Sequence, residues 1–527
     1  MPRRPALTFR SVSSAGLFAI ALAIGAYVAR PFQTASIAFD SQVAVLDFSR
    51  LLAGRHVEVF LSTTPKPLLT LIFGPLELLS HDWRTLAWAT LIAFALAVVL
   101  SAELARRLGG TPAWAFVGAG LVGSGALLFD VGYALATPWA LLGWAVAGLA
   151  LTGQRPHYGL AGVALLLASL ARLETLLIVA TAGVVLLALE AGPIRRAVVA
   201  RGPNPAPGPP PRRAWLVLIG LGALPVMGLH DLLIYGDPLF WSSVPARYSA
   251  ITSRPILAVP DLLGWLVGRY VGLWPLTVLA LAGVVRLGRL RAWPILVGLA
   301  AIGPGMAAFL VYLAARRIEV PDRYAAPIDL ALILAAGFGT AWLLGLLTAR
   351  LRSRSPASWP GVLPGLAAIA LAVVATWPSG FLDGGLADSI HGSLALAADV
   401  DRMDPILAGI VDRSPGGRAW PATISLSPDG PSPARLLVPV GYRPRIAVDL
   451  DAPLTTVGQL LPNTIGAPGT IPAVGQVLVH DQHADGSYAA FRAYETTTRQ
   501  TIDGVAVVPI AADPARGWWI TEIQAAP

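Results

Sequence analysis

Two acids and one lysine in the stretch 37–70 have the chemistry needed to transfer a group to a hydroxyl. Asp40 and Asp47 are carboxylates that can take a proton from an attacking hydroxyl. Lys66 lies between two prolines and is the only lysine of the chain. Its ammonium group can hold a phosphate and stabilise the charge that grows on it as it leaves. The stretch therefore offers a base and a phosphate-binding cation.

Each of these residues also has a structural interpretation. Asp40 can act as the N-cap of the amphipathic stretch 42–52, and Asp47 can face solvent and pair with Arg50 at helical spacing. Lys66 can anchor a helix end by extending its ammonium group to the membrane surface. We favour catalysis for Asp40, phosphate contact for Lys66 and a solvated position for Asp47.

The composition is typical of a membrane protein that crosses the bilayer many times. Hydrophobic residues make up 55% of the chain and charged residues only 13%, and the mean hydropathy is +0.66. The formal charge of +8 comes from arginine; in such a protein it marks topology and does not indicate a nucleic-acid partner. The absence of cysteine excludes disulfides, thiolate metal sites and cysteine nucleophiles.

The hydropathy pattern predicts about eleven membrane-spanning helices, each needing about 20 mostly apolar residues. The expected spans are 13–30, 85–104, 112–130, 134–152, 157–170, 173–189, 214–235, 261–285, 293–314, 325–348 and 361–378. Residues 67–80 are apolar but too short to cross, so we expect an interfacial or re-entrant segment. The proline-rich basic stretch 192–213 is expected to be a cytoplasmic connector.

The arginine clusters orient these spans. With a cytoplasmic N-terminus, every short arginine cluster but one falls in a cytoplasmic loop, as the positive-inside rule requires. The loop 31–84 then faces outward, and so do other ionisable residues that are distant in sequence: Asp130, Arg269, Arg316, Arg317 and Arg323. Ionisable residues near a membrane are costly and are functional candidates by default. We therefore expect an outward-facing cavity with one or two carboxylates and several cations.

Residues 379–527 contain no expected span, and short alternating runs at 475–480, 489–494 and 505–510 indicate strands. We predict a small β-containing domain outside the membrane, following a transmembrane domain at 1–378. His480, Asp481 and His483 have the chemistry of metal ligands, but we interpret them as part of a solvated loop.

The order of several short motifs resembles the GT-C superfamily of membrane glycosyltransferases, which includes protein O-mannosyltransferases, aminoarabinose transferases and mycobacterial arabinofuranosyltransferases. The matching motifs are an acid soon after the first helix (Asp40), Pro-Lys-Pro-Leu at 65–68, Ala-Arg-Arg-Leu-Gly at 105–109, Arg-Leu-Glu at 172–174, Tyr-Gly-Asp-Pro-Leu at 235–239 and Arg-Tyr-Ala-Ala-Pro at 323–327. The resemblance covers roughly residues 10–378. It departs from many relatives in two places, because Ser41 follows Asp40 where they have a second acid, and Leu173 replaces a proline.

This resemblance implies an enzyme that uses a polyprenyl-phosphate sugar. Asp40 would be the general base, with Asp130 as a second acid, and attack would invert the sugar's anomeric carbon. The donor phosphate would be bound by cations, and the lipid carrier would lie beside an aromatic ring; the residues implied are Lys66, Arg323, Arg316, Arg317 and Arg269 for the phosphate and Tyr324 for the lipid. Arg323 has an alternative as an ion-pair partner of Asp322 or Asp329. No cofactor is assigned, and a divalent metal is left open.

We therefore predict a polytopic α-helical glycosyltransferase with a GT-C-like fold in a bacterial plasma membrane. Its C-terminal domain would be extracytoplasmic, and the acceptor would be a cell-envelope glycan or lipoglycan. The competing hypothesis is a transporter or flippase of a lipid-linked sugar. That hypothesis predicts polar residues near the bilayer midplane, whereas the charged residues here gather at one face.

Overall fold

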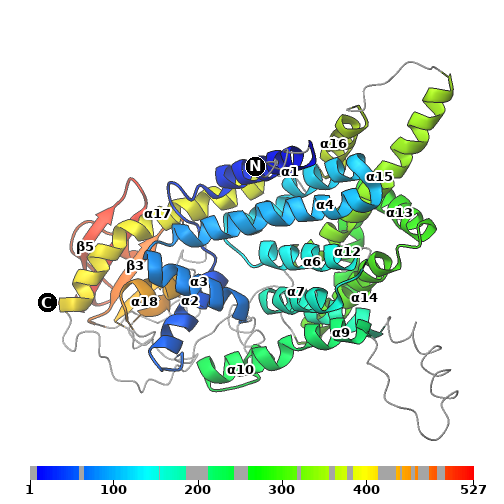
Figure 1. Ribbon diagram of the computed structural model, residues 1–527. Helices are drawn as coiled ribbons and strands as arrows, with labels where there is room; N and C mark the ends of the chain where they lie inside the picture. Colours follow the sequence, from blue (N-terminus) through cyan, green and yellow to red (C-terminus); the bar gives the residue numbers. More distant parts are fainter. Residues whose placement is uncertain are drawn as a thin grey trace, which may run out of the picture.

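The structure is a computed structural model that describes residues 9–527 with internal gaps. The gaps are 58–64, 153–154, 185–211, 243–258, 317–321, 355–362, 377–383, 414–434, 440–441, 453–456, 461–473 and 484–492. Helices form most of the described chain, and a small sheet lies at one end of the molecule (Figure 1). Nearly all of the predicted connector at 192–213 lies outside the described residues.

The helices before residue 380 are apolar and follow the hydropathy pattern of the sequence. They are α1 (Phe9–Ala29), α2 (Phe39–Leu52), α3 (Pro67–Ser80), α4 (Arg84–Val122), α5 (Gly125–Gly132), α6 (Thr137–Leu151), α7 (Tyr158–Ala171), an unlabelled helix Glu174–Val184, α9 (Arg212–Leu221), α10 (Ala223–Tyr235), α12 (Val259–Gly272), α13 (Trp274–Arg289), α14 (Trp293–Ala315), the 3-10 turn η1 (Asp322–Ala325), α15 (Ala326–Arg354) and α16 (Leu363–Thr376).

Five described helices are long and apolar enough to cross a membrane. They are Val12–Ala29, Arg84–Val122, Ala214–Tyr235, Ile295–Ala315 and Ala326–Leu351, and the pair Pro260–Gly272 and Trp274–Arg289, bent by 87°, makes a sixth if it is one span. Several expected spans are shorter apolar helices: Thr137–Leu151, Tyr158–Ala171, Glu174–Val184 and Leu363–Thr376. The number eleven therefore stays a prediction, while the helical membrane architecture is confirmed.

The long element α4 contains a chain reversal at Gly110, whose φ of 76° and ψ of −165° are not helical. Gly25 of α1 lies against Leu91, and Gly118 lies against Leu17 of α1. Residues 17 and 25 of one helix are about 12 Å apart, whereas residues 91 and 118 of a straight helix would be about 40 Å apart. Both contacts are met only if α4 folds back at the glycine. The break lies between the expected spans 85–104 and 112–130.

The C-terminal part combines a long helix with a six-stranded mixed sheet of order β2-β1-β3-β6-β5-β4. Strand β1 pairs in parallel with β2 and β3, and β3-β6-β5-β4 are antiparallel. The elements are α17 (Gly384–Arg413), β1 (Leu436–Pro439), α18 (Arg443–Asp449), β2 (Val457–Leu460), β3 (Val477–Asp481), β4 (Gln500–Ile502), β5 (Val505–Asp513) and β6 (Trp518–Ala525). Two of the predicted strand runs are β3 and β5; of the third, 489–494, only Ala493 and Tyr494 are described, and they form a short 3-10 turn.

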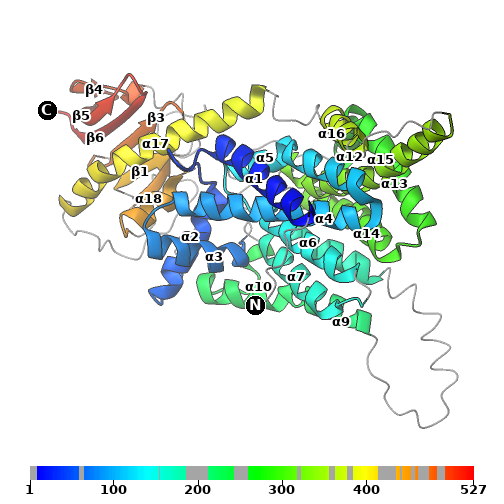
Figure 2. The same ribbon diagram turned by 45° about the horizontal axis from the view of Figure 1, so that its top comes forward.

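The sheet and helix α2 share one hydrophobic core. Val43 and Leu46 of α2 belong to the same buried cluster as Met403 of α17 and Val479 of β3. The opposite side of α2 contributes Ala44 and Val45 to a cluster with α3 and α4. Helix α2 therefore lies between the transmembrane helices and the C-terminal part, with α18 beside it in both views (Figures 1 and 2).

Candidate functional site

Asp40 and Lys66 form a salt bridge that joins α2 to the residue before α3. The Lys66 Nζ atom lies 2.7 Å from Asp40 Oδ2, and the two side chains are 16% and 7% exposed. Asp40 is in the first turn of α2, and Lys66 directly precedes α3, which begins at Pro67. The structure thus brings together the predicted base and the predicted phosphate-binding cation.

The N-terminus of α2 is fixed by bonds to the backbone around it. The amide of Ala38 donates to the Tyr133 carbonyl at 2.8 Å, and Ser41 Oγ donates to the Ala134 carbonyl at 2.8 Å. Ala38 is the N-cap residue, without a side-chain capping bond. Asp40 therefore does not cap the helix, but its negative charge lies in the first turn, where the helix dipole favours an anion.

Asp47 is fully buried, so the expectation that it faces solvent and pairs with Arg50 was wrong. The Tyr235 hydroxyl donates to Asp47 Oδ1 at 2.7 Å, and Arg50 donates instead to the Ala452 carbonyl at 2.9 Å. Asp40 and Asp47 are seven residues apart and so lie on one face of α2. Burial raises the pKa of Asp47 to about 7, against the opposing charge of His230 and the Tyr235 hydrogen bond.

Three functional candidates near Asp47 were missed by sequence reasoning. His230 Nε2 lies 3.3 Å from Thr70 Oγ1, and His230 Nδ1 lies 2.9 Å from Asp231 Oδ1. Tyr235, which contacts Asp47, follows on the same helix. The signal was present, because adjacent histidine and aspartate inside the apolar stretch 214–235 are functional candidates at a membrane. These side chains extend the polar cluster from α2 to α10.

Asp130 lies in a second polar cluster built around Arg172. Asp130 is completely buried, and its Oδ2 atom is 3.5 Å from Arg172 Nη1. Arg172 also donates to Glu174 and to Thr137. The Arg172 guanidinium lies 5.8 Å from the centre of the Tyr324 ring. Asp130 is therefore held by a structural cation, and its catalytic role stays a prediction.

The structure describes the side chains of only some of the other predicted phosphate ligands. Arg269 donates to Asp329 at 2.6 Å, and Arg316, which is exposed, donates to the Ser242 carbonyl at 3.1 Å. Arg317 lies outside the described residues. The backbone of Arg323 lies in η1, and its side chain lies outside the described part of the chain.

A largely apolar cavity of about 390 Å³ runs among the transmembrane helices. It is lined by residues of α4, α6, α7, α14 and α15, among them Trp144, Ile302 and Leu330. Pro327, three residues after Tyr324, contributes to the same wall. Tyr324 itself packs edge-on against Phe309, with ring centres 5.4 Å apart. The cavity can hold an apolar chain next to the predicted lipid-contacting tyrosine.

The whole chain is similar to a solved membrane protein. ArnT from Cupriavidus metallidurans, in its structure bound to undecaprenyl phosphate, shares 17% sequence identity and superposes with a TM-score of 0.52 over 96% of this chain and 97% of ArnT. The chain has the GT-C fold. The resemblance inferred from the motifs is thus confirmed for the fold, and with its apolar helices this is an integral membrane protein.

A weaker similarity is to the archaeal oligosaccharyltransferase AglB from Archaeoglobus fulgidus, solved with an inhibitory peptide and a dolichol-phosphate. The identity is 14%, the TM-score is 0.48, and the match covers 84% of this chain and 64% of AglB. No protein-family model matches the sequence, and no curated protein matches it.

Proposed function

We propose that this protein is an inverting glycosyltransferase that moves a sugar from a polyprenyl-phosphate donor to a hydroxyl of an extracytoplasmic acceptor. The observation that carries the proposal is the 2.7 Å salt bridge between Asp40 and Lys66, whose side chains are 7% and 16% exposed. A cation at this distance favours the ionised carboxylate, which is the form that accepts a proton. The same cation is proposed to bind the donor phosphate.

In the proposed reaction the acceptor hydroxyl attacks the anomeric carbon opposite the phosphate. The new bond joins the acceptor oxygen to that carbon, the bond between the carbon and the phosphate oxygen breaks, and Asp40 takes the hydroxyl proton. Polyprenyl phosphate leaves with one additional negative charge. Lys66 stabilises this charge, and Arg323, Arg316, Arg317 and Arg269 are the further cations proposed for it. Asp130 is proposed as a second acid.

The cavity among the transmembrane helices is the proposed site for the lipid carrier. A polyprenyl chain is apolar, and the cavity to which Pro327 contributes is lined almost wholly by apolar side chains. Tyr324 would contact the carrier near its phosphate end. The proposed location is a bacterial plasma membrane, with the N-terminus cytoplasmic and residues 379–527 extracytoplasmic. This domain would orient a cell-envelope glycan or lipoglycan acceptor beside α2.

The test is sugar transfer by the purified protein in liposomes, supplied with a panel of polyprenyl-phosphate sugars and envelope-derived acceptors. Asp40→Asn keeps the size of the side chain and removes the base, so we expect turnover to fall by a factor of about 10² to 10⁴. Lys66→Met should weaken donor binding as well as turnover. Asp82→Asn is the matched control, because Asp82 is an exposed acid of the same loop that pairs with Arg84.

Equal turnover by wild type and Asp40→Asn would refute Asp40 as the base. Donor binding and translocation across the liposome without transfer to any acceptor would instead establish the transporter class.

A further inference from the structure

Asp399, Asp481 and His483 form a compact group at the junction of α17 and β3, outside the proposed catalytic site. Asp399 lies on α17, Asp481 ends β3, and His483 follows two residues later. Their ligand atoms all lie within 4.8 Å of one another. The interpretation of His480, Asp481 and His483 as a solvated loop was wrong for the first two, which lie in β3 and are 6% and 1% exposed, whereas His483 lies in an exposed turn.

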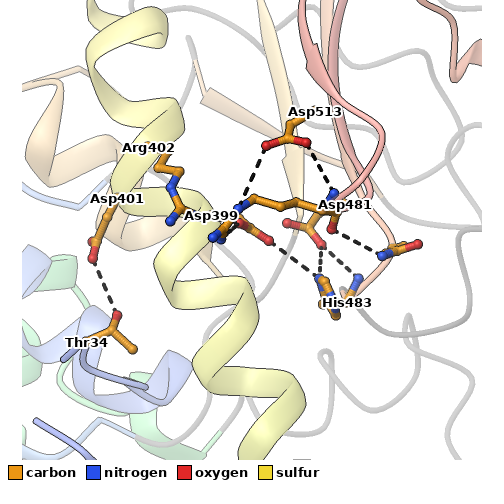
Figure 3. A network of polar contacts seen from close by, with 9 residues as sticks. Thr34, Asp399, Asp401, Arg402, Asp481, His483 and Asp513 are labelled. Atoms are coloured by element: carbon orange, nitrogen blue, oxygen red, sulfur yellow. Dashed lines mark hydrogen bonds and ion pairs between the residues drawn. The ribbon is translucent and has the colours of Figure 1, made fainter.

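The distances in this group match those around a small divalent ion. His483 Nδ1 lies 3.2 Å from Asp481 Oδ1 and 3.5 Å from Asp399 Oδ2. Zinc binds nitrogen and oxygen ligands at about 2.0–2.2 Å, and tetrahedral geometry then separates neighbouring ligand atoms by about 3.3–3.6 Å. In Figure 3 the two carboxylates and the imidazole ring point toward one another. Only small movements are needed for all three to contact one ion.

A second observation points to a ligand in the same place. The Oδ2 atom of Asp481 is buried and makes no hydrogen bond in the described structure, although the carboxylate belongs to a side chain that is 1% exposed. A buried carboxylate oxygen without a partner is costly. A cation between the two carboxylates would remove this cost.

The two neighbouring arginines contact one carboxylate oxygen of Asp399, and the other oxygen is the proposed metal ligand. Arg402 and Arg516 contact the Oδ1 atom of Asp399, at 3.2 and 3.4 Å. The Oδ2 atom of the same carboxylate faces His483. Arg516 also lies 3.8 Å from Asp513. The arginines therefore fix the orientation of Asp399, in the way that outer hydrogen bonds orient metal ligands.

We infer that Asp399, Asp481 and His483 bind one divalent transition-metal ion, with zinc as the best fit to one imidazole and two carboxylates. A solvent molecule completes the coordination on the side of His483, which is 30% exposed. The ion joins a helix to a strand 82 residues away in sequence, in a protein that has no cysteine for disulfides. Its role is to hold α17 against the sheet.

The test is zinc binding by the full-length protein in detergent, after treatment with a chelator and removal of that chelator. Metal content after gel filtration gives the stoichiometry, and competition with a chromophoric chelator gives the affinity. We expect one zinc per chain, bound at least 10-fold more weakly by His483→Gln and by Asp481→Asn. His391→Gln is the control, because His391 is an exposed histidine on the same α17 and should bind like wild type.

Thermal unfolding shows whether a variant that loses zinc binding is still folded. Zinc should raise the unfolding midpoint of wild type and His391→Gln, and should leave that of His483→Gln unchanged. The metal-free His483→Gln protein should melt with the metal-free wild type, which shows that it is folded. Failure of folded wild type to bind zinc stoichiometrically would overturn the inference, as would a His483→Gln variant that binds as tightly as wild type.

Discussion

Replacing Asp47 by asparagine is expected to stabilise the folded protein most at alkaline pH and to leave its stability nearly unchanged below pH 3.8. The side chain has no solvent exposure, and burial raises the pKa of Asp47 from 3.8 to about 7. Asparagine keeps the shape of the protonated acid and can still accept the hydrogen bond from the Tyr235 hydroxyl. It cannot acquire the buried negative charge.

The sign of the change in stability follows from proton binding by Asp47. The folded protein binds the Asp47 proton more tightly than the unfolded chain does, so this residue favours folding most below pH 3.8. The contribution is lost as the pH rises through about 7. A rise of about three pKa units corresponds to about 4 kcal/mol, at about 1.4 kcal/mol per unit. If the chain unfolds as one unit, this is a shift of about 4 °C, since the unfolding entropy is about 2.1 cal/mol/K per residue.

The assay is the apparent midpoint of thermal unfolding in detergent, measured from pH 5 to pH 8.5. The midpoint of Asp47→Asn minus that of wild type should be about 1.5 °C at pH 5, where the unfolded chain is already ionised, and grow toward about 4 °C at pH 8.5. Asp82→Asn is the control, because the Arg84 hydrogen bond lowers the pKa of Asp82 and this exposed acid does not titrate in the range. Tyr235→Phe removes a bond to the charged form and should move the wild-type transition to higher pH. A difference that does not change with pH would refute this account of Asp47.

Two further substitutions test how the first outer loop is held. Arg445→Met removes a buried cation that pairs with three carboxylates, and should lower the free energy of unfolding by about 3 kcal/mol. The control is Arg84→Met, in the exposed Arg84–Asp82 pair, which should lower the free energy of unfolding by less than about 1 kcal/mol in the same melting assay. Gly74→Ala places a methyl group 2.1 Å from Phe48 of α2; forcing α2 and α3 apart should cost about 1–3 kcal/mol and reduce sugar transfer, whereas Gly159→Ala, with open space around it, should leave transfer unchanged.

The fold and the first pair of site residues could be predicted because their signals are local. Membrane helices appear in sequence as apolar stretches of fixed length, and Asp40 and Lys66 lie in one short polar loop after the first of them. The number of spans was harder to predict. Helices such as α6 and α7 have 15 and 14 residues, so their hydropathy alone does not say whether they cross. Helix α17 could have been found from its buried side chains at spacings of three and four residues, including Ile390, Leu394 and Ala397.

The wrong prediction for Asp47 has a different physical cause. Within its own segment, α2 has polar and apolar residues at helical spacing, which is typical of a helix with one solvated face. What covers that face is distant in sequence. Asp47 is covered by Tyr235, 188 residues later, and Arg50 is bonded to Ala452, 402 residues later. No local pattern contains this information.

These long-range contacts assign the C-terminal part a role in building the site. The amide of Arg445, in α18, donates to the Gln42 side chain at 3.2 Å, and Gln42 donates to the Ile37 carbonyl at 2.7 Å. Gln42 is two residues from Asp40 on α2. Because this side chain joins α18 to the segment that leads into α2, the position of the Asp40 carboxylate depends on residues more than 400 positions away. A C-terminal part without any recognisable catalytic motif is therefore needed to hold the proposed base in place.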